Sequence, residues 1–268
     1  MKKGIRGHDV KAEGICNISS VCNKRGIEYL QLALDRSIED FSVGKFSQEY
    51  AESIKNELGD MKIAILGSYI NPSNPDAEAL RYDLEKFKEK IKYATVLKPI
   101  AVGTETGKYK EGLTDSEEAY QYLLKNIKEL VKEAEKHRVN IAIEGVHCLV
   151  INTPQKLKRL IDDVNSDNLK AIFDPVNYIN INNYTRQDEI IEEVFSLFSD
   201  RLCAIHAKDF VVEEGVIERR LPGEGMLNYR LIFEKMKEHN VDVPIICEEI
   251  SDDNAVVAFD NLEKISAI

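Results

Sequence analysis

The sequence predicts one (β/α)₈ barrel, a ring of eight parallel strands in which a helix follows each strand. Its 268 residues are close to the about 250 that this fold usually takes. Short apolar runs alternate with amphipathic helical stretches along the chain, which is typical of β–α units. No linker rich in proline, glycine or serine interrupts this alternation. We therefore expect residues 1–268 to form a single domain.

Four strand–helix units are expected in the first half of the chain. The strands are residues 4–7, 27–33, 62–66 and 93–101, and the helices are residues 12–24, 47–58, 75–92 and 116–137. Ser47 can cap the second of these helices, because its hydroxyl can accept a free N–H of the first turn. Gly59 and Asp60 end that helix.

Four further units are expected in the second half. The strands are residues 140–144, 169–174, 202–206 and 243–248, and each contains a short continuous apolar run of the kind that buried parallel strands show. Thr153 followed by Pro154 is a favourable helix start. A turn at residues 222–225 precedes a helix at residues 229–239, and an amphipathic helix closes the chain.

Composition argues against two classes of partner. The net charge is -11 and no basic tract is present, so we expect no nucleic-acid partner, because such binding needs a positive surface. No apolar run approaches the about 18 residues of a membrane span, and residues 1–8 contain no apolar signal-peptide core. The five cysteines include no CxxC pair, which favours reduced thiols and a cytoplasmic location.

Each of the last four expected strands ends in a side chain that can bind a metal: Glu144, Asp174, His206 and Glu248. The carboxyl ends of barrel strands meet at one mouth. A single such residue is more often solvated or ion-paired, but four at the same point of consecutive strands indicate a shared site. Three carboxylates and one imidazole favour Mn²⁺ or Mg²⁺, and Co²⁺ or Zn²⁺ are also compatible.

The identity of the last ligand depends on the register of the eighth strand. Side chains alternate between the two faces of a strand, so Glu248 and Glu249 point in opposite directions. We expect Glu248 to face the site because it follows the apolar run directly, and Glu249 stays the alternative.

Five short segments resemble the sugar isomerase/epimerase group that has the xylose isomerase-like TIM barrel. This group includes ketose 3-epimerases, hydroxypyruvate isomerases, inosose dehydratases and endonuclease IV. The resemblance covers nearly the whole chain, and the segments that carry it are Ala142-Ile143-Glu144, Phe173-Asp174-Pro175, Ile205-His206-Ala207-Lys208-Asp209, Leu221-Pro222-Gly223-Glu224-Gly225 and Ile246-Cys247-Glu248.

The resemblance implies one divalent metal ion, most often Mn²⁺, with four ligands: Glu144, Asp174, His206 and Glu248. In the ketose 3-epimerases of this group the two glutamates also form the acid–base pair, one on each face of the substrate. The trinuclear zinc site of endonuclease IV needs many histidines, whereas this chain has 5 and is acidic, so that branch is excluded.

The resemblance also suggests contacts to the substrate. Arg219 stands where ketose 3-epimerases have a substrate-binding arginine, and His147 where some members have a polar contact. Asn177 replaces their histidine, three residues after the metal aspartate, which leaves the substrate open. Three residues could bind substrate hydroxyls or a phosphate, although each could equally be a solvated charge: Lys208, Glu105 and Arg219. His8 is a further candidate for substrate binding.

We therefore expect a metal-dependent isomerase or epimerase of a small sugar, sugar phosphate or hydroxy-ketone. The proton would move through an enediolate held by the metal, with one of Glu144 and Glu248 taking it and the other returning it. An inosose-type dehydratase that uses the same site, and a barrel that binds a sugar without catalysis, are the alternatives. A homodimer or a homotetramer is allowed.

Overall fold

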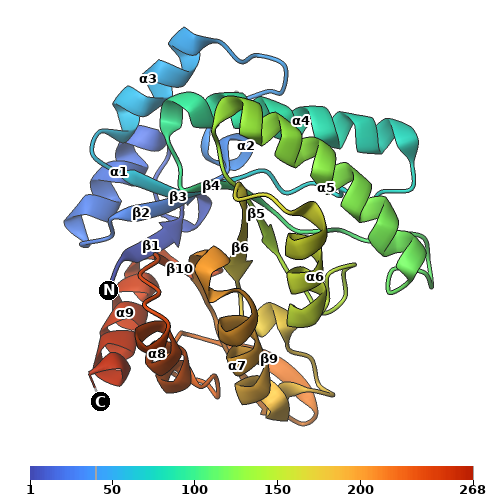
Figure 1. The fold of residues 1–268 in the computed structure, drawn as a ribbon. Helices are drawn as coiled ribbons and strands as arrows, with labels where there is room; N and C mark the ends of the chain where they lie inside the picture. Colours follow the sequence, from blue (N-terminus) through green and yellow to red (C-terminus); the bar gives the residue numbers. More distant parts are fainter. Residues whose placement is uncertain (40, 268) are drawn as a thin grey trace.

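Eight parallel strands close into a barrel in the computed structural model of the chain, which describes residues 1–39 and 41–267. Around the barrel the order is β1, β10, β7, β6, β5, β4, β3 and β2, and the ring closes where β2 pairs with β1 (Figure 1). The strand bounds are Lys3–Arg6 (β1), Tyr29–Leu32 (β2), Lys62–Gly67 (β3), Ala101–Thr104 (β4), Ile141–Glu144 (β5), Leu169–Phe173 (β6), Leu202–Ala207 (β7) and Ile245–Cys247 (β10). The predicted (β/α)₈ barrel is confirmed.

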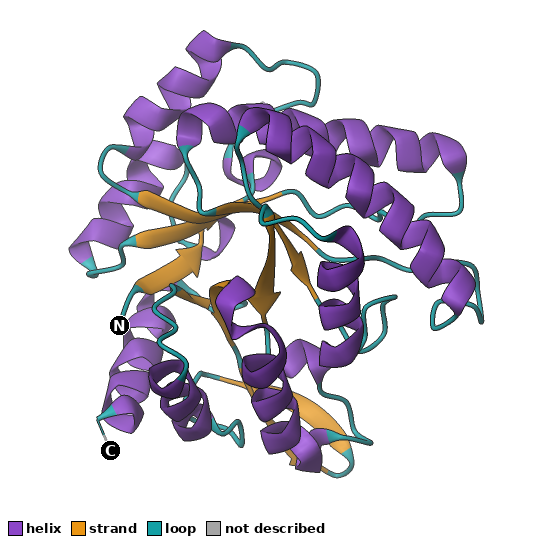
Figure 2. Cartoon of the chain, viewed as in Figure 1, coloured by secondary structure: helices purple, strands orange, loops and turns teal. Residues whose placement is uncertain are grey.

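Helices surround this barrel on its outer side (Figure 2). Their bounds are Ile15–Lys24 (α1), Leu34–Ser37 (α2), Gln48–Leu58 (α3), Ala77–Leu97 (α4), Glu117–His137 (α5), Pro154–Val164 (α6), Gln187–Phe198 (α7), Tyr229–Glu238 (α8) and Asp252–Ser266 (α9). Side-chain caps start several of them, including the expected caps Ser47 and Thr153, which accept N–H groups of α3 and α6. Within residues 1–39 and 41–267, no helix combines the length and the apolar character that a bilayer crossing needs.

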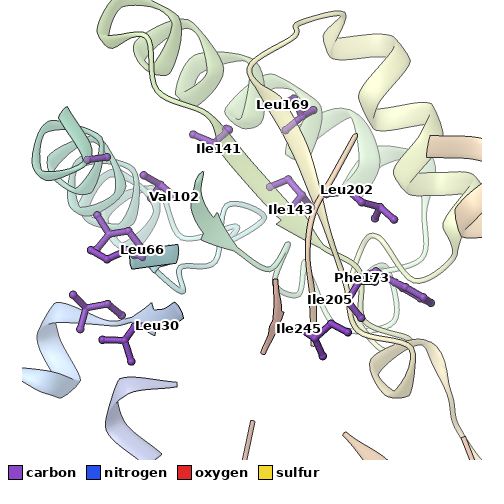
Figure 3. Close-up of a cluster of buried hydrophobic side chains, with 14 of the residues drawn as sticks. Leu30, Leu66, Val102, Ile141, Ile143, Leu169, Phe173, Leu202, Ile205 and Ile245 are labelled. Atoms are coloured by element: carbon purple, nitrogen blue, oxygen red, sulfur yellow. The ribbon is translucent and has the colours of Figure 1, made fainter. Parts of the chain in front are cut away.

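Alternation along the strands separates the outer core from the barrel interior. In β5, Ile141 and Ile143 point outward into the large apolar core that the helices cover, together with residues such as Leu169 and Ile205 of the neighbouring strands (Figure 3). Ala142, between the two isoleucines, belongs to a smaller cluster of mostly small residues inside the ring. Because the period is two, the residue after Ile143 faces inward again at the end of the strand.

The barrel interior is narrow, and glycine creates room in it. A Cβ at Gly103 would lie 2.9 Å from the Ile172 side chain, which real Cβ atoms do not tolerate. The small interior cluster therefore fills the ring as a packed layer.

One expected strand is wrong in position. Residues 93–97 belong to α4 and not to a strand, and β4 begins only at Ala101. Tyr93, Ala94 and Leu97 are buried because they lie on the inner face of α4. The apolar residues that suggested a strand therefore form the packed face of a helix. Lys98 then ends the helix in the left-handed conformation, one residue before Pro99.

Several elements had no predicted bounds, among them α2, α7 and a hairpin. Helix α7 lies between β6 and β7, where the predicted barrel requires a helix but no bounds were predicted. A two-stranded antiparallel hairpin, β8 (Asp209–Glu213) and β9 (Val216–Arg220), follows β7 at the barrel mouth. Its two-residue turn, Glu214-Gly215, has positive φ at both positions (49° and 79°), which a glycine accommodates readily.

Candidate metal centre and active site

Four predicted ligands converge at the carboxyl end of the barrel. Glu144 ends β5, Asp174 follows β6, His206 lies in β7 and Glu248 follows β10, and all four side chains are buried. Barrel closure makes this possible, because β5, β6, β7 and β10 are consecutive neighbours in the ring. Each residue occupies the inward phase of its strand.

The imidazole of His206 faces the three carboxylates with one nitrogen. Its Nδ1 lies 3.2 Å from Glu144 Oε1, 3.5 Å from Glu248 Oε1 and 3.8 Å from Asp174 Oδ2. Metal–ligand bonds of about 2.0–2.4 Å place neighbouring donor atoms about 3–3.5 Å apart. The donor atoms of Glu144, Asp174 and His206 also lie within 4.8 Å of one another. The spacing and the oxygen-rich donor set fit one divalent cation.

The charge of this cluster also fits a cation. Burial by itself lowers the pKa of His206, but the charges of Glu248, Glu144 and Asp174 raise it to about 9. The cluster therefore attracts positive charge strongly enough to protonate a buried imidazole, and a divalent ion satisfies the same field.

Lys208 supplies part of the positive charge. Its ammonium lies 2.9 Å from Asp174 Oδ2 and 2.9 Å from Glu248 Oε2, and only 6% of the side chain is exposed. Burial lowers the pKa of Lys208, but these carboxylates and Glu144 outweigh it and raise the pKa above the ordinary value. Lys208 was predicted as a substrate contact, and the structure places it on the metal-site carboxylates.

Two carboxamides hold the two glutamates. Asn177 Nδ2 donates to Glu144 Oε1 at 2.7 Å, and Gln31 Nε2 donates to Glu248 Oε1 at 2.6 Å. Gln31 Nε2 also lies 2.7 Å from the hydroxyl of Tyr69, which is partly buried. Each carboxylate therefore has one oxygen fixed by an amide from a different part of the ring.

A cavity of about 310 Å³ opens above the cluster. It is lined by Arg6, His8, Ala33, Arg36, Tyr69, Glu105, Glu144, Val146, Asn177, Lys208, Glu248 and Glu249. Burial and the nearby charge of Glu144 raise the pKa of Glu105 to about 7, so this carboxyl can be protonated near neutrality. The structure thus brings His8, Glu105 and Asn177 to the same mouth as the four predicted ligands.

Arg219 and His147 lie outside this cavity. They line a neighbouring cavity beside the β8–β9 hairpin, together with Asn177. Arg219 is half exposed, and its Nε is 3.4 Å from Glu249 Oε2. The exposed His147 donates its backbone N–H to Asn177 O at 2.7 Å, so it supports the residue that holds Glu144.

Asp209 fixes the loop that follows the hairpin. Its buried carboxylate accepts four backbone N–H groups: those of Phe210, Gly223, Gly225 and Leu227, at 2.8–3.0 Å. The segment at residues 221–227 is therefore tied to the end of β7. The two consecutive residues therefore face opposite ways: Lys208 contacts the carboxylates of Asp174 and Glu248, and Asp209 binds the loop.

The register of the last strand agrees with the expectation. Ile246 belongs to the interior cluster and Glu248, two residues later, is buried at the site. Glu249 has a positive φ of 61° and a side chain that is 43% exposed. Glu248 is therefore the residue that joins the cluster.

Sequence reasoning missed Gln31, Tyr69, Arg6 and Arg36. A glutamine inside the otherwise apolar run Tyr29-Leu30-Gln31-Leu32 was a usable signal, because a buried amide in a strand needs a partner. The two arginines carried no such signal.

The model of the family described as xylose isomerase-like TIM barrel matches residues 20–266. The chain belongs to this family. Among curated proteins, none matches the sequence.

Solved structures show how widely this xylose isomerase-like fold is shared. A D-tagatose 3-epimerase-like protein superposes with a TM-score of 0.79 at 19% identity, over 99% of this chain and 97% of its own. The IolI protein with a bound zinc atom gives 0.76 at 19% identity, over 100% and 97%. The D-psicose 3-epimerase of Clostridium cellulolyticum H10, with D-tagatose, gives 0.75 at 16% identity, over 99% of both chains. At these identities the likeness concerns the fold.

Proposed function

We propose that this protein is a divalent-metal-dependent isomerase or epimerase of a small, unphosphorylated ketose or hydroxy-ketone. One observation carries the proposal: three buried carboxylates surround Nδ1 of His206 at 3.2–3.8 Å in a cavity at the barrel mouth. The relatives named above include ketose 3-epimerases, which agrees with this chemistry. We further propose that one domain, residues 1–268, carries the activity.

The donor set supports Mn²⁺ as the ion, with Mg²⁺, Co²⁺ and Zn²⁺ as substitutes, because hard oxygen donors predominate. A structural relative holds zinc and another holds magnesium, so more than one ion fits this architecture. The five cysteines are all free and supply no ligand. Free thiols also agree with a cytoplasmic location.

Charge balance supports a neutral substrate. Three ligand carboxylates are offset by Lys208 and a divalent ion, so the loaded centre carries no net charge. Arg6 is held by Asp9 at 2.7 Å, and Lys208 by Asp174 and Glu248. In the described part of the chain Arg36 forms no ion pair, so a phosphate would meet this one unpaired guanidinium and would face the carboxylate of Glu249.

A bound divalent ion would supply Lewis-acid polarisation of the substrate carbonyl and its neighbouring hydroxyl. Glu144 removes the proton on the carbon next to the carbonyl, since its Oε2 accepts no hydrogen bond from a described residue. Glu248 lies across the cluster and, after taking a proton from solvent, returns it to the other face or to the adjacent carbon, while the proton on Glu144 is released to solvent. Asn177 and Gln31 keep the two carboxylates in these positions.

The test is a set of paired ketoses, free and phosphorylated, incubated with metal-loaded protein in deuterium oxide. The metal is then removed with a chelator and the sugars are examined by ¹H NMR. We expect deuterium to enter next to the carbonyl of an unphosphorylated ketose, together with an epimer or isomer. Loss of a β-hydroxyl would instead identify a dehydratase. If protein with verified metal exchanges no proton of any ketose, the proposal is wrong.

A further inference from the structure

A second cavity adjoins the site. It has a volume of about 520 Å³ and shares two lining residues, His8 and Arg36, with the cavity above the metal centre. We infer that this second cavity binds a second sugar unit, so that the substrate is a disaccharide or longer saccharide with its ketose end at the metal centre. This inference rests on the proposed function and names its substrate class.

The position of the second cavity makes this extension possible. The 3-10 helix at Gly7–Asp9 follows β1, and α2 follows β2, so both line the cavity from the carboxyl face of the barrel. From there the cavity continues between α1 and α3, which pack against each other at the outer side of the barrel (Figure 1). We call this cavity the α1–α3 groove. A substituent that leaves the metal centre past His8 enters it directly.

Size separates the two compartments. The cavity above the metal, at about 310 Å³, is at the lower end of the about 300–1,000 Å³ that small-molecule sites occupy. It suits a single sugar. The groove offers further space beyond the shared residues, more than a free ketose can use.

The lining of the groove suits a hydroxylated ring and not a phosphate. Ile15, Ile18 and Ile54 give an aliphatic floor on which the C–H face of a sugar can pack. Exposed carboxylates stand at its edge, among them Glu13 and Glu57, and carboxylates accept hydrogen bonds from hydroxyls. These acidic groups outnumber the cations of the lining and would repel a phosphate.

The junction holds polar atoms without protein partners. Neither ring nitrogen of His8 forms a hydrogen bond with a residue in the described part of the chain. Ser37 lines the groove as a residue that is 8% exposed, and its buried hydroxyl likewise lacks a partner among those residues. Buried polar groups normally find partners, but these atoms have almost no accessible surface, so a ligand hydroxyl reaches them only if the side chains rotate toward the groove.

The test compares two ketoses that differ only in a second sugar. Fructose and isomaltulose, which is fructose carrying glucose on O6, are titrated into the metal-loaded protein by calorimetry. We expect isomaltulose to bind about tenfold tighter, as one or two additional hydrogen bonds would give. Equal dissociation constants for the two sugars would overturn the inference.

Variants locate the effect. Glu13→Trp and Glu57→Trp each place a bulky ring in the groove at an exposed position, and we expect both to abolish the preference for isomaltulose. Glu52→Trp is the matched control, because Glu52 is an exposed glutamate of α3 that does not line the groove. A preference that survives both groove variants, or that Glu52→Trp removes equally, would contradict the assignment.

A third probe tests the chemistry of the occupant. If 6-O-benzyl-fructose binds tighter than fructose while isomaltulose does not, the groove binds an apolar group and the sugar assignment is wrong. The deuterium exchange assay is read separately. Absent exchange with an intact binding preference would refute the proposed function alone, and exchange of fructose without a preference would refute the groove alone.

Discussion

The two glutamates of the centre differ in how tightly the protein holds them. Glu144 receives Asn177 on Oε1, and its Oε2 accepts no hydrogen bond from the described residues. Glu248 is engaged on both oxygens, by Gln31 on Oε1 and by Lys208 on Oε2. A symmetric pair of bases would need similar surroundings, and these are not similar.

The charges around Glu248 increase the difference. Burial would raise the pKa of Glu248, but His206, Lys208 and Arg6 together lower it below the usual carboxyl range. A carboxylate with a low pKa is a weak base. We therefore propose that Glu144 removes the proton. With so low a pKa Glu248 is ionised in the free protein, so it can return a proton only after it has taken one from solvent.

Replacing each glutamate by glutamine is expected to give the largest effect. Glutamine keeps an oxygen that can coordinate but cannot accept the proton, so both variants should retain metal and lose about 10²–10⁴-fold in turnover. We expect Glu144→Gln to abolish deuterium exchange as well. Glu248→Gln should still exchange the substrate proton while failing to complete the conversion.

Metal content measured on the same samples is the control for this pair. Exchange retained by Glu144→Gln but lost by Glu248→Gln would reverse the two roles. Full activity of either variant, with metal occupancy verified, would remove that residue from the mechanism.

Lys208→Met tests what distinguishes Glu248. The lysine is buried between two carboxylates, and removal of one partner of a buried ion pair typically costs about 3–5 kcal/mol. We expect the metal-free variant to lose unfolding free energy in this range, measured by urea denaturation, and to recover part of it when Mn²⁺ is added. An unchanged unfolding free energy without metal would show that Lys208 does not balance the cluster.

The two carboxamides offer the finest comparison. Asn177→Leu removes the amide from Glu144, and Gln31→Leu removes the amide from Glu248. Groups that orient metal ligands typically contribute about 10–100-fold to affinity or activity. We expect both variants to lose activity within this range, with the rate of deuterium exchange reduced mainly in Asn177→Leu. Equal exchange rates in the two variants would argue against separate roles for the glutamates.

Alternation in the strands explains why much of the architecture could be predicted. An apolar run that ends in a glutamate predicts a buried strand and the position of its end. This pattern is present at Ile141, Ile143 and Glu144, and again at Ile245, Ile246 and Glu248. Barrel closure then brings the strand ends together, which local sequence cannot show but the fold class implies.

The sequence failed where contacts depend on distant partners. Residues 93–97 are apolar whether they pack as helix or strand, and only the packing of α4 decides between the two. Gln31 donates a hydrogen bond to Glu248, which is 217 positions away in the sequence, so no local pattern predicts that contact. The hairpin that carries Arg219 was not recognised from the sequence, so its ion pair with Glu249, a residue of the cavity lining, was not anticipated, and its contact with substrate stays a prediction.

Anomalous diffraction from crystals grown with Mn²⁺ tests the central claim most directly. We predict a single strong peak per chain at bonding distance, about 2.0–2.4 Å, from His206 Nδ1 and from the carboxylates of Glu144, Asp174 and Glu248. His206→Ala crystals under the same conditions should lack it. A peak elsewhere, or no peak in wild-type crystals at saturating Mn²⁺, would contradict the assignment of these four residues as the metal centre.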